Sequence, residues 1–135
     1  MATLKLTNAF DQLLAARGLL EAAEVRETEV EALVDTGATL LVLPDEVVTR
    51  LGLDEIDRRP VRYADGRREE RAIVGPVRLE VIGRHGNFSA VREKPGTTPL
   101  IGQVVLEELD LIVNPGSEEL LPDPDSPDAP MVDIF

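Results

Sequence analysis

The 135-residue sequence contains no cysteine and no tryptophan, and it has a single histidine, His85. Without cysteine, the chain can neither form disulfides nor perform thiol chemistry. One histidine without cysteines also argues against a structural zinc site of the usual kind, and we expect no metal and no other cofactor. His85 lies in the Gly-Arg-His-Gly stretch at 83–86, which is typical of a turn, and no candidate nucleophile stands beside it. We therefore predict an exposed turn histidine rather than a catalytic base.

Basic residues are scarce: 14 lysines and arginines stand against 26 aspartates and glutamates, which gives a net charge of −12. Such a chain should be repelled by phosphate backbones and by anionic membrane surfaces, so we expect neither a nucleic-acid nor a membrane partner. No stretch approaches the roughly 20 apolar residues of a membrane-spanning helix. Residues 1–7 lack the basic start and the apolar run of a signal peptide. These absences predict a soluble, cytoplasmic protein.

The sequence has no internal repeat, and its length suits one domain with a modest core. We place that domain at residues 1–121. The remaining tail, residues 122–135, contains four prolines and three aspartates between 122 and 130, and no basic residue. This composition predicts an extended or disordered segment. Its apolar end, residues 131–135, is expected to dock onto the body of the protein or onto a partner subunit.

Strand and helix patterns alternate along the chain. Runs of alternating or continuous apolar residues predict four strands, at 25–34, 77–82, 87–92 and 120–121. Near the N-terminus, residues 4–6 indicate a short strand at most. A helix should begin at residues 44–46, where acidic side chains suit the positive end of the helix dipole, and end at Gly52.

An earlier helix is predicted over residues 9–17. Asn8 is a candidate N-cap for this helix, and the next glycine ends the pattern. Apolar residues recur at helical spacing, so the helix should pack against the body through Phe10, Leu13 and Leu14. We predict no role for it beyond packing.

The sequence is organised around residues 33–44. An apolar strand ends in Asp35, the chain turns at Thr36, Gly37 and Ala38, and a second apolar strand follows. An aspartate at the end of a buried strand is costly unless it is hydrogen-bonded or functional, and Gly37 lets the backbone approach the carboxylate closely. We therefore predict that Asp35 is the catalytic residue. The alternative is an ordinary turn aspartate in a hairpin.

Two later segments carry further signals. Asp65-Gly66 lies between extended runs that are rich in charge, which predicts a hairpin that projects from the body. Leu100 and Ile101 precede Gly102, and an apolar pattern of helical spacing follows. We expect Gly102 to let this strand pass close to the central turn, where a Cβ atom would clash.

Residues 33–38 resemble the hydrophobic-hydrophobic-Asp-Thr-Gly-Ala active-site motif of the retropepsin-like aspartic proteases (clan AA), in their single-domain bacterial-type form. The stretch Leu100-Ile101-Gly102 is similar to the glycine motif that lies beside the catalytic loop in this family. The resemblance covers residues from about 25 to 113. It implies an all-β fold with one to three short helices, closed into a barrel-like acid-protease structure that forms homodimers.

The resemblance also implies a reaction, the hydrolysis of peptide bonds by a water molecule that an aspartate dyad activates. Because the sequence has one Asp-Thr-Gly motif, Asp35 of two subunits would form the dyad. Thr36, Gly37 and Ala38 would then support the catalytic loop. The partners implied are a second copy of the chain and a peptide or protein substrate, without a cofactor.

In this family, a hairpin between the catalytic loop and the glycine motif closes over the substrate as a flap. Position and composition match residues 61–72, with the tip near Ala64, Asp65 and Gly66. Tyr63, the only tyrosine, would line the substrate cleft. A surface hairpin with a framework tyrosine is the alternative.

The sequence departs from the retroviral pattern in three ways. Gln103 stands where retroviral enzymes carry arginine, and no acidic partner follows Ala38, so the ion pair that braces their subunits is missing. The flap tip is less rich in glycine, and a proline- and aspartate-rich tail intervenes before any interface strand.

Two other functions stay open. One is a catalytically weak or inactive protease-like module for dimerisation or peptide binding, and the other is an unrelated small β-barrel binding protein.

Overall fold

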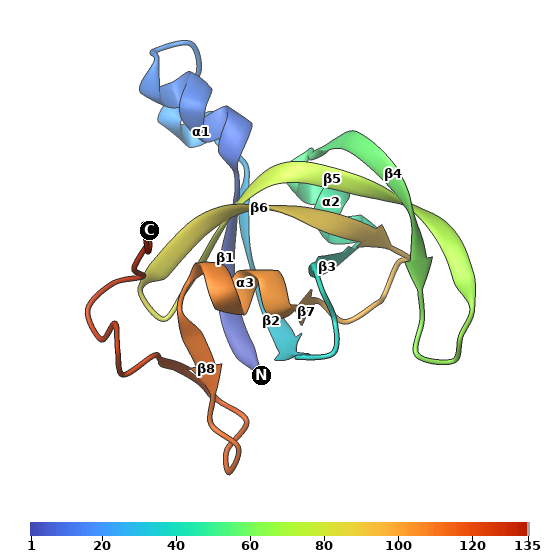
Figure 1. Cartoon of the computed structure of the whole chain (residues 1–135). Coiled ribbons are helices and arrows are strands. Elements are labelled where there is room, and N and C mark those ends of the chain that lie inside the picture. Colours follow the sequence, from blue (N-terminus) through green and yellow to red (C-terminus); the bar gives the residue numbers. More distant parts are fainter. Residues whose placement is uncertain (135) are drawn as a thin grey trace.

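The computed structural model describes residues 1–134, and its elements are shown in Figure 1. In chain order they are β1 (Ala2–Asn8), α1 (Ala9–Ala16), a 3-10 helix η1 (Ala22–Glu24), β2 (Glu27–Val34), β3 (Leu41–Pro44), α2 (Asp45–Leu51), β4 (Asp54–Arg62), β5 (Arg68–Val81), β6 (Arg84–Glu93), β7 (Leu100–Ile101), α3 (Gln103–Glu108), β8 (Leu111–Val113) and β9 (Leu120–Pro122). Among residues 1–134, no helix is both long and apolar enough to cross a membrane.

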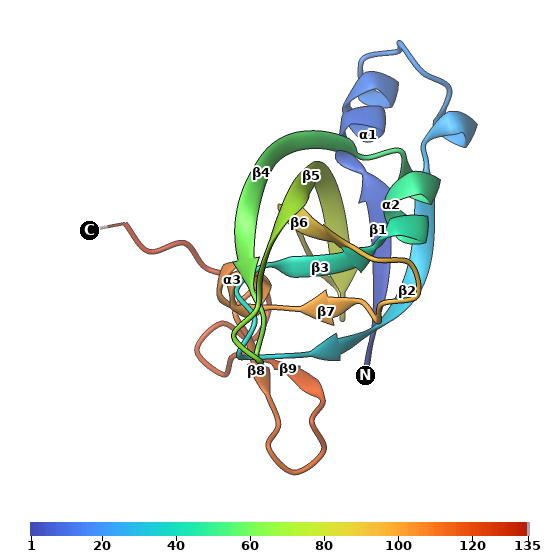
Figure 2. The ribbon, with the colours of Figure 1, turned by 90° about the vertical axis from the view of Figure 1, so that its right-hand side faces the viewer.

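Six strands close into a barrel. The main sheet runs in the order β1-β2-β7-β3-β6-β5-β4, and β1 also pairs with β5, which joins the two sides. Strand β4 lies outside this ring and pairs with β5, and β8 pairs with β9 in a separate two-stranded sheet. Figure 2 looks into the curved sheet. The predicted all-β architecture with a closed barrel and short helices is therefore confirmed.

The core fills the barrel with aliphatic side chains. Complete burial of a leucine or valine side chain contributes about 1.5–3 kcal/mol, so the interior supplies most of the stability. The largest fully buried side chains are Leu4, Leu6, Leu41, Leu43, Val48, Leu51, Val74, Val77, Leu79, Val81, Ile101 and Leu109. Helix α2 contributes to this core, as predicted from its apolar stripe, and ends at Gly52 in the left-handed conformation.

Several strands are longer than the sequence indicated, and the strand predicted at 77–82 is the end of the 14-residue β5, which continues from the hairpin. The short strand expected at 4–6 is the seven-residue β1, whose Leu4 and Leu6 are fully buried because it pairs with β2 on one side and β5 on the other. The hairpin strand β4 begins at Asp54, well before the predicted hairpin at 61–72. Almost every residue of β4 is exposed, so no apolar alternation marks it in the sequence.

Helix α1 forms as predicted, but the expected packing face is wrong. The Asn8 side chain caps it by accepting a hydrogen bond of 3.0 Å from the backbone N–H of Asp11. Phe10 and Leu13 are 51% and 47% exposed, however, and the buried residue of the helix is Asp11. The reason is position, because α1 projects beyond one end of the barrel, where little apolar surface is available to cover its stripe (Figure 1).

The turn before β6 is shorter than predicted. It consists of Ile82 and Gly83, both with positive φ, and β6 begins at Arg84 rather than at residue 87. His85 is exposed, as expected, but it lies on the strand opposite Glu80 rather than in the turn. Arg84, the residue before His85, is buried, because successive side chains of a strand point to opposite faces and that of Arg84 points inward.

Buried Arg84 holds the C-terminal tail onto the barrel. Its guanidinium donates to the carbonyl oxygens of Leu109 (2.9 Å), Asp110 (3.0 Å) and Ser126. The backbone N–H of Met131 donates to the Asp110 carboxylate at 2.7 Å. The tail is therefore fixed along its middle, although it contains no regular element after β9.

The apolar end of the tail, residues 131–135, was expected to dock either onto the body or onto a partner subunit. Docking onto the body is wrong for the described residues 131–134. Met131 is 60% exposed, and Val132 and Ile134 are more exposed still. Phe135, which the same expectation included, lies outside the described residues. The exposed stretch 132–134 makes no hydrogen bond among residues 1–134, so the tail is attached through residues 123–131 only.

We expect removal of residues 123–135 to lower the free energy of unfolding by about 1–3 kcal/mol, because the Arg84 guanidinium would lose a carbonyl partner inside the protein. Urea denaturation would measure the change. Removal of residues 132–135 alone is the control, and it should leave stability nearly unchanged. Equal effects of the two truncations would contradict the anchoring role of Ser126.

A second buried charge joins α1 to Arg26, the residue that precedes β2. The Asp11 side chain is 6% exposed and accepts hydrogen bonds from the Arg26 backbone N–H (3.1 Å), Nε (2.8 Å) and Nη2 (2.9 Å). The Arg26 side chain is half-exposed. Its hydrogen bonds hold the pKa of Asp11 below the usual range, although burial alone would raise that pKa.

We expect Asp11→Ala to lower the free energy of unfolding by about 2 kcal/mol at neutral pH. This loss is smaller than for a fully buried ion pair, because solvent screens the half-exposed Arg26 side chain. The folded-state pKa of Asp11 is depressed, so this stabilisation is present above the unfolded pKa of about 3.9 and disappears as the pH falls through the folded value. Denaturation of both proteins between pH 7 and pH 2 would test this. Asp57 forms an exposed ion pair with Arg59 and serves as the control. Asp57→Ala should change the free energy of unfolding little.

Candidate active site

The turn between β2 and β3 folds around the Asp35 carboxylate. The backbone N–H of Gly37 donates to Asp35 Oδ1 at 2.9 Å, and that of Ala38 donates to the Asp35 carbonyl at 3.1 Å. The Asp35 N–H is itself bonded to the Ile101 carbonyl at 3.0 Å. One main-chain hydrogen bond thus holds the carboxylate, and two others fix the Asp35 backbone.

The sequence led us to expect Asp35 at the end of a buried strand, and this is wrong for the single chain. Asp35 and Thr36 are both exposed, and Ala32 is the one fully buried residue of β2. Glutamates occupy alternate positions of β2 up to residue 31, so its outer face meets solvent. Leu33, the last side chain on that face, is apolar and still 45% exposed. The turn therefore presents a carboxylate and an apolar side chain together at the surface.

The glycine motif packs directly behind this turn. Strand β7 lies between β2 and β3, with Leu100 opposite both Leu33 and Val42. The first N–H groups of α3 then donate to the turn, from Gln103 to the Ala38 carbonyl at 2.8 Å and from Val104 to the Thr39 carbonyl at 2.9 Å. Two elements distant in sequence therefore hold the backbone that carries Asp35.

Gly102 permits this close passage, as predicted. A Cβ atom at residue 102 would lie 2.5 Å from the Leu40 carbonyl oxygen and 2.8 Å from that of Ala38. Both obstacles are backbone atoms, which no side-chain rotation can move. Any other residue would displace either the turn or the start of α3.

The predicted projecting hairpin is present and longer than expected. Strands β4 and β5 are joined by a turn at Tyr63–Arg67, closed by hydrogen bonds of 2.9 Å from Tyr63 N to the Arg67 carbonyl and from Gly66 N to the Tyr63 carbonyl. Gly66 has φ of +87°, which explains the need for glycine there. Figures 1 and 2 both place the hairpin tip at the end of the barrel where the β2–β3 turn lies.

Tyr63 fastens the hairpin tip to β6. Its hydroxyl donates to the Glu93 carboxylate and accepts a hydrogen bond of 2.9 Å from Arg71 Nε, and the Arg67 guanidinium lies 4.7 Å from the centre of its ring. Burial and the bond to Glu93 raise the pKa of the Tyr63 hydroxyl. The side chain is half-buried in this network. Its predicted contact with a substrate stays a prediction.

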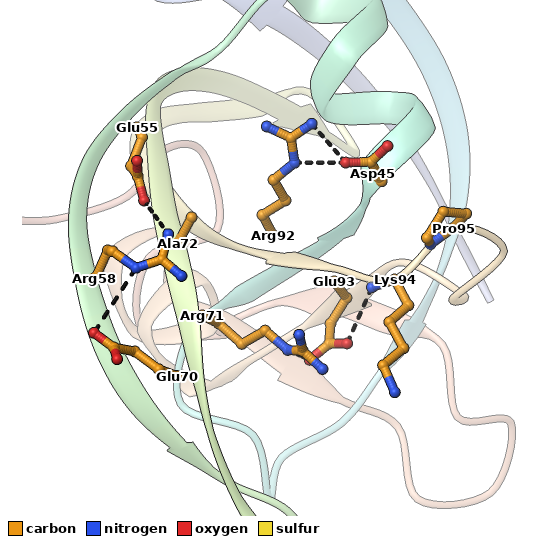
Figure 3. Close-up of a pocket in the computed structure, with 10 residues that line it drawn as sticks. All are labelled: Asp45, Glu55, Arg58, Glu70, Arg71, Ala72, Arg92, Glu93, Lys94 and Pro95. Carbon is orange, nitrogen blue, oxygen red and sulfur yellow. Dashed lines mark hydrogen bonds and ion pairs between the residues drawn. The ribbon is translucent and has the colours of Figure 1, made fainter.

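A charged cavity of about 360 Å³ lies beneath the hairpin (Figure 3). It opens to solvent and is bordered by β4, β5, the start of α2, the end of β6 and the two residues that follow β6. Its lining consists of Asp45, Glu55, Arg58, Glu70, Arg71, Ala72, Arg92, Glu93, Lys94 and Pro95. No sequence pattern predicts this cavity, since its residues come from segments that only the fold brings together.

A second groove, of about 520 Å³, begins at Thr36 in the β2–β3 turn. Helix α3 and strand β8 form its walls, and its lining residues are Thr36, Gln103, Leu106, Glu107, Asp110, Leu111, Ile112, Val113 and Asp123. This groove was also missed from the sequence. Among residues 1–134, no group of three or more histidine, cysteine, aspartate or glutamate side chains is arranged to hold a metal ion.

We expect Gly102→Ala to lower the free energy of unfolding by about 1–3 kcal/mol and to weaken any function of the turn, because the added methyl group meets two backbone oxygens. Thermal and urea unfolding would measure the loss. Gly116→Ala is the matched control, since a Cβ at residue 116 meets one side-chain atom at an ordinary 3.5 Å. A Gly102→Ala protein as stable as the control would contradict the close packing.

Comparisons with known proteins agree with this geometry. No curated protein matches the chain. The solved structure of the retroviral protease-like domain of Ddi1 from Leishmania major has a similar fold, with a TM-score of 0.52 and 19% sequence identity, over 92% of this chain and 89% of that one. A family model described as aspartyl protease matches residues 22–121, and with its retropepsin-like barrel the chain therefore belongs to the retropepsin-like aspartyl protease family.

Proposed function

We propose that the protein is an aspartic endopeptidase whose catalytic dyad is formed by Asp35 from two copies of the chain. The observation that carries the proposal is the turn at Asp35: one exposed carboxylate that accepts a hydrogen bond from the Gly37 N–H, on a backbone that is hydrogen-bonded to Ile101 and backed by Gly102. Each chain supplies a single Asp-Thr-Gly motif, whereas the family reaction uses two carboxylates. A two-fold axis beside Asp35 is the simplest way to provide the second.

In the proposed mechanism, the two Asp35 carboxylates share one proton. Two carboxylates about 3 Å apart cannot both ionise easily, so the pair titrates as a unit. The ionised member acts as general base on a water molecule, and the protonated member polarises the scissile carbonyl group. Thr36 of each chain would hydrogen-bond across the axis and fix the separation of the carboxylates.

Two surface features support a second copy at this position. Leu33 places an apolar side chain, 45% exposed, immediately before the turn. The groove that starts at Thr36 continues along β8, where Ile112 is 39% exposed, and its antiparallel neighbour Leu121 is 40% exposed. Leu33 lies two residues before Asp35 and the groove begins at Thr36, so an interface that extends from the turn along β8 and β9 would cover these apolar groups and complete the site.

The β4–β5 hairpin is the proposed flap. Ala64, Asp65 and Gly66 at its tip are exposed, and the tip lies at the end of the barrel that carries Asp35 (Figure 1). A peptide seated between the turn and the hairpin would be shielded from water on both sides. The alternative function, a protease-like module that dimerises or binds peptides with little or no turnover, uses the same surfaces and differs only in catalysis.

We expect the protein to have roughly twice the 14.7 kDa chain mass in light scattering and to cleave peptides from a mixed library. Asp35→Asn should keep the dimer and lose activity by about a hundred- to ten-thousand-fold, because the general base is removed. Asp128→Asn, an exposed change in the tail, is the control and should cleave normally.

Three other outcomes have distinct meanings. A dimer in which neither wild type nor Asp35→Asn cuts any peptide would favour the binding module. An active monomer would overturn the shared dyad. Activity that survives Asp35→Asn in a dimer would place the chemistry elsewhere.

A further inference from the structure

The outer part of the β4–β5 hairpin is a ribbon of two strands that extends beyond the barrel (Figure 1). Among residues 1–134, the pairing of β5 with β6 begins at Ile73, opposite Val91. The pairing of β5 with β4 continues further out, to Arg68 opposite Arg62. In this part of the chain, the ribbon of residues 58–72 therefore lacks a third strand. A two-stranded hairpin is marginally stable alone in water, so other contacts must fix its position relative to the barrel.

Three side chains, Tyr63, Arg71 and Glu93, link this ribbon to β6. The Tyr63 hydroxyl donates to the Glu93 carboxylate. Arg71 Nε donates to that hydroxyl at 2.9 Å and lies 3.4 Å from the carboxylate. The Glu93 side chain is 10% exposed and that of Arg71 is 20% exposed, and Figure 3 shows the two side by side. Because water screens a half-buried pair less than an exposed one, these contacts are stronger than surface ion pairs.

The other ion pairs of the ribbon do not attach it to the barrel. Three further arginines of the hairpin are more than half-exposed, and all their carboxylate partners lie within residues 55–70 of the same hairpin. Beneath the ribbon lies the solvent-open cavity of about 360 Å³, which is lined mainly by charged side chains. Within the described residues, the group of Tyr63, Arg71 and Glu93 therefore supplies the side-chain hydrogen bonds between the ribbon and the rest of the protein.

The position of Glu93 determines where the ribbon is held. Strand β3 begins at Leu41, near the Asp35 turn, and ends at Pro44. Strand β6 runs parallel to β3, and Glu93 is the residue opposite Pro44. This end of β3 is three residues, or about 10 Å, further from the turn than Leu41 is. In Figure 1 the loop that joins β4 to β5 and the β2–β3 turn lie apart at the same end of the barrel. Through Tyr63, the ribbon is therefore held back from Asp35.

We propose that Tyr63, Arg71 and Glu93 form a latch, which holds the hairpin withdrawn from the Asp35 turn until a peptide binds. The proposal rests on the proposed function, because it takes the hairpin as the flap of the Asp35 site. When the latch opens, the ribbon bends near Ile73, where its pairing with β6 ends. A segment with few buried apolar contacts opens at low free-energy cost, which contacts with a bound peptide can offset. Glu93 and Arg71 are then positioning residues, which act on the site through Tyr63.

Hydrogen exchange tests whether the latch holds the ribbon in the free protein. Glu93→Gln keeps the shape of the side chain and removes the charge that accepts the Tyr63 hydrogen bond. We expect the amides of residues 58–72 to exchange about tenfold faster in this variant, because one charge-assisted hydrogen bond is lost. Amides of the core strand β1 should exchange as in the wild type. Glu70→Gln is the matched control and should change neither, since Glu70 is 65% exposed and contacts Arg58 of the same hairpin.

Tyr63 provides a second readout, because it is the only tyrosine and the sequence contains no tryptophan. The ultraviolet absorbance of the ionised phenol therefore reports on this side chain alone. Burial and the bond to Glu93 raise the pKa of the Tyr63 hydroxyl. Glu93→Gln should lower this pKa toward the ordinary value of about 10, whereas Glu70→Gln should leave it as it is in the wild type.

Kinetics test the link between the latch and the site. The substrate is the library peptide that the wild-type protein cleaves fastest. We expect Glu93→Gln to lower KM by up to about tenfold and to leave kcat unchanged, because peptide binding no longer has to break the latch. Glu70→Gln should keep both constants of the wild type.

The latch and the hydrolytic function can fail separately. Equal exchange of the ribbon in the wild type and Glu93→Gln would overturn the latch. Faster exchange of the ribbon and the core together would also overturn it, because the group would then be purely structural. Faster ribbon exchange with an unchanged or higher KM would overturn the withdrawn position. Faster ribbon exchange in a protein whose wild type cleaves no peptide would support the latch and refute the hydrolytic function.

Discussion

The close approach of Gly102 to the β2–β3 turn is the constraint on which the site depends. Strand β7 has only two residues, yet it lies between β2 and β3 and supplies the carbonyl that fixes the Asp35 backbone. Immediately after it, the first N–H groups of α3 bond to the carbonyls of Ala38 and Thr39. Because a Cβ at residue 102 would meet backbone oxygen within 3 Å, this arrangement tolerates only glycine. The backbone that carries the exposed Asp35 carboxylate is thereby held in place.

The hairpin opposite the turn is built on a different principle. Strand β4 is almost wholly exposed; it is held by its backbone pairing with β5, and its side-chain contacts are surface ion pairs, which contribute little individually. The tip is fastened by the half-buried group of Tyr63, Glu93 and Arg71. Segments with few buried apolar contacts open at low free-energy cost. The protein thus combines a turn fixed by main-chain contacts with a hairpin whose tip is attached to β6 through the Tyr63 contacts.

The sequence by itself determined the local features of the site. The Asp-Thr-Gly-Ala turn, Gly102, the Asp65-Gly66 turn, the N-cap at Asn8 and helix α2 all follow from short patterns, because each depends on backbone conformation or on spacing within a few residues. The closed all-β barrel followed from resemblance rather than from periodicity. Closure depends on pairing between β1 and β5, which no local pattern encodes.

Only the tertiary structure decided which side chains meet water and which charges meet one another. The apolar stripe of α1 is exposed while Asp11 is buried, because the helix projects from the barrel and Arg26 reaches its inner side. Arg84 points into the barrel by strand alternation, and its burial is tolerated because the carbonyls of three distant residues accept its hydrogen bonds. The charged cavity likewise exists only where β4, β5, α2 and β6 converge. Burial and ion pairing are properties of long-range contacts, so they were fixed by how the barrel closes.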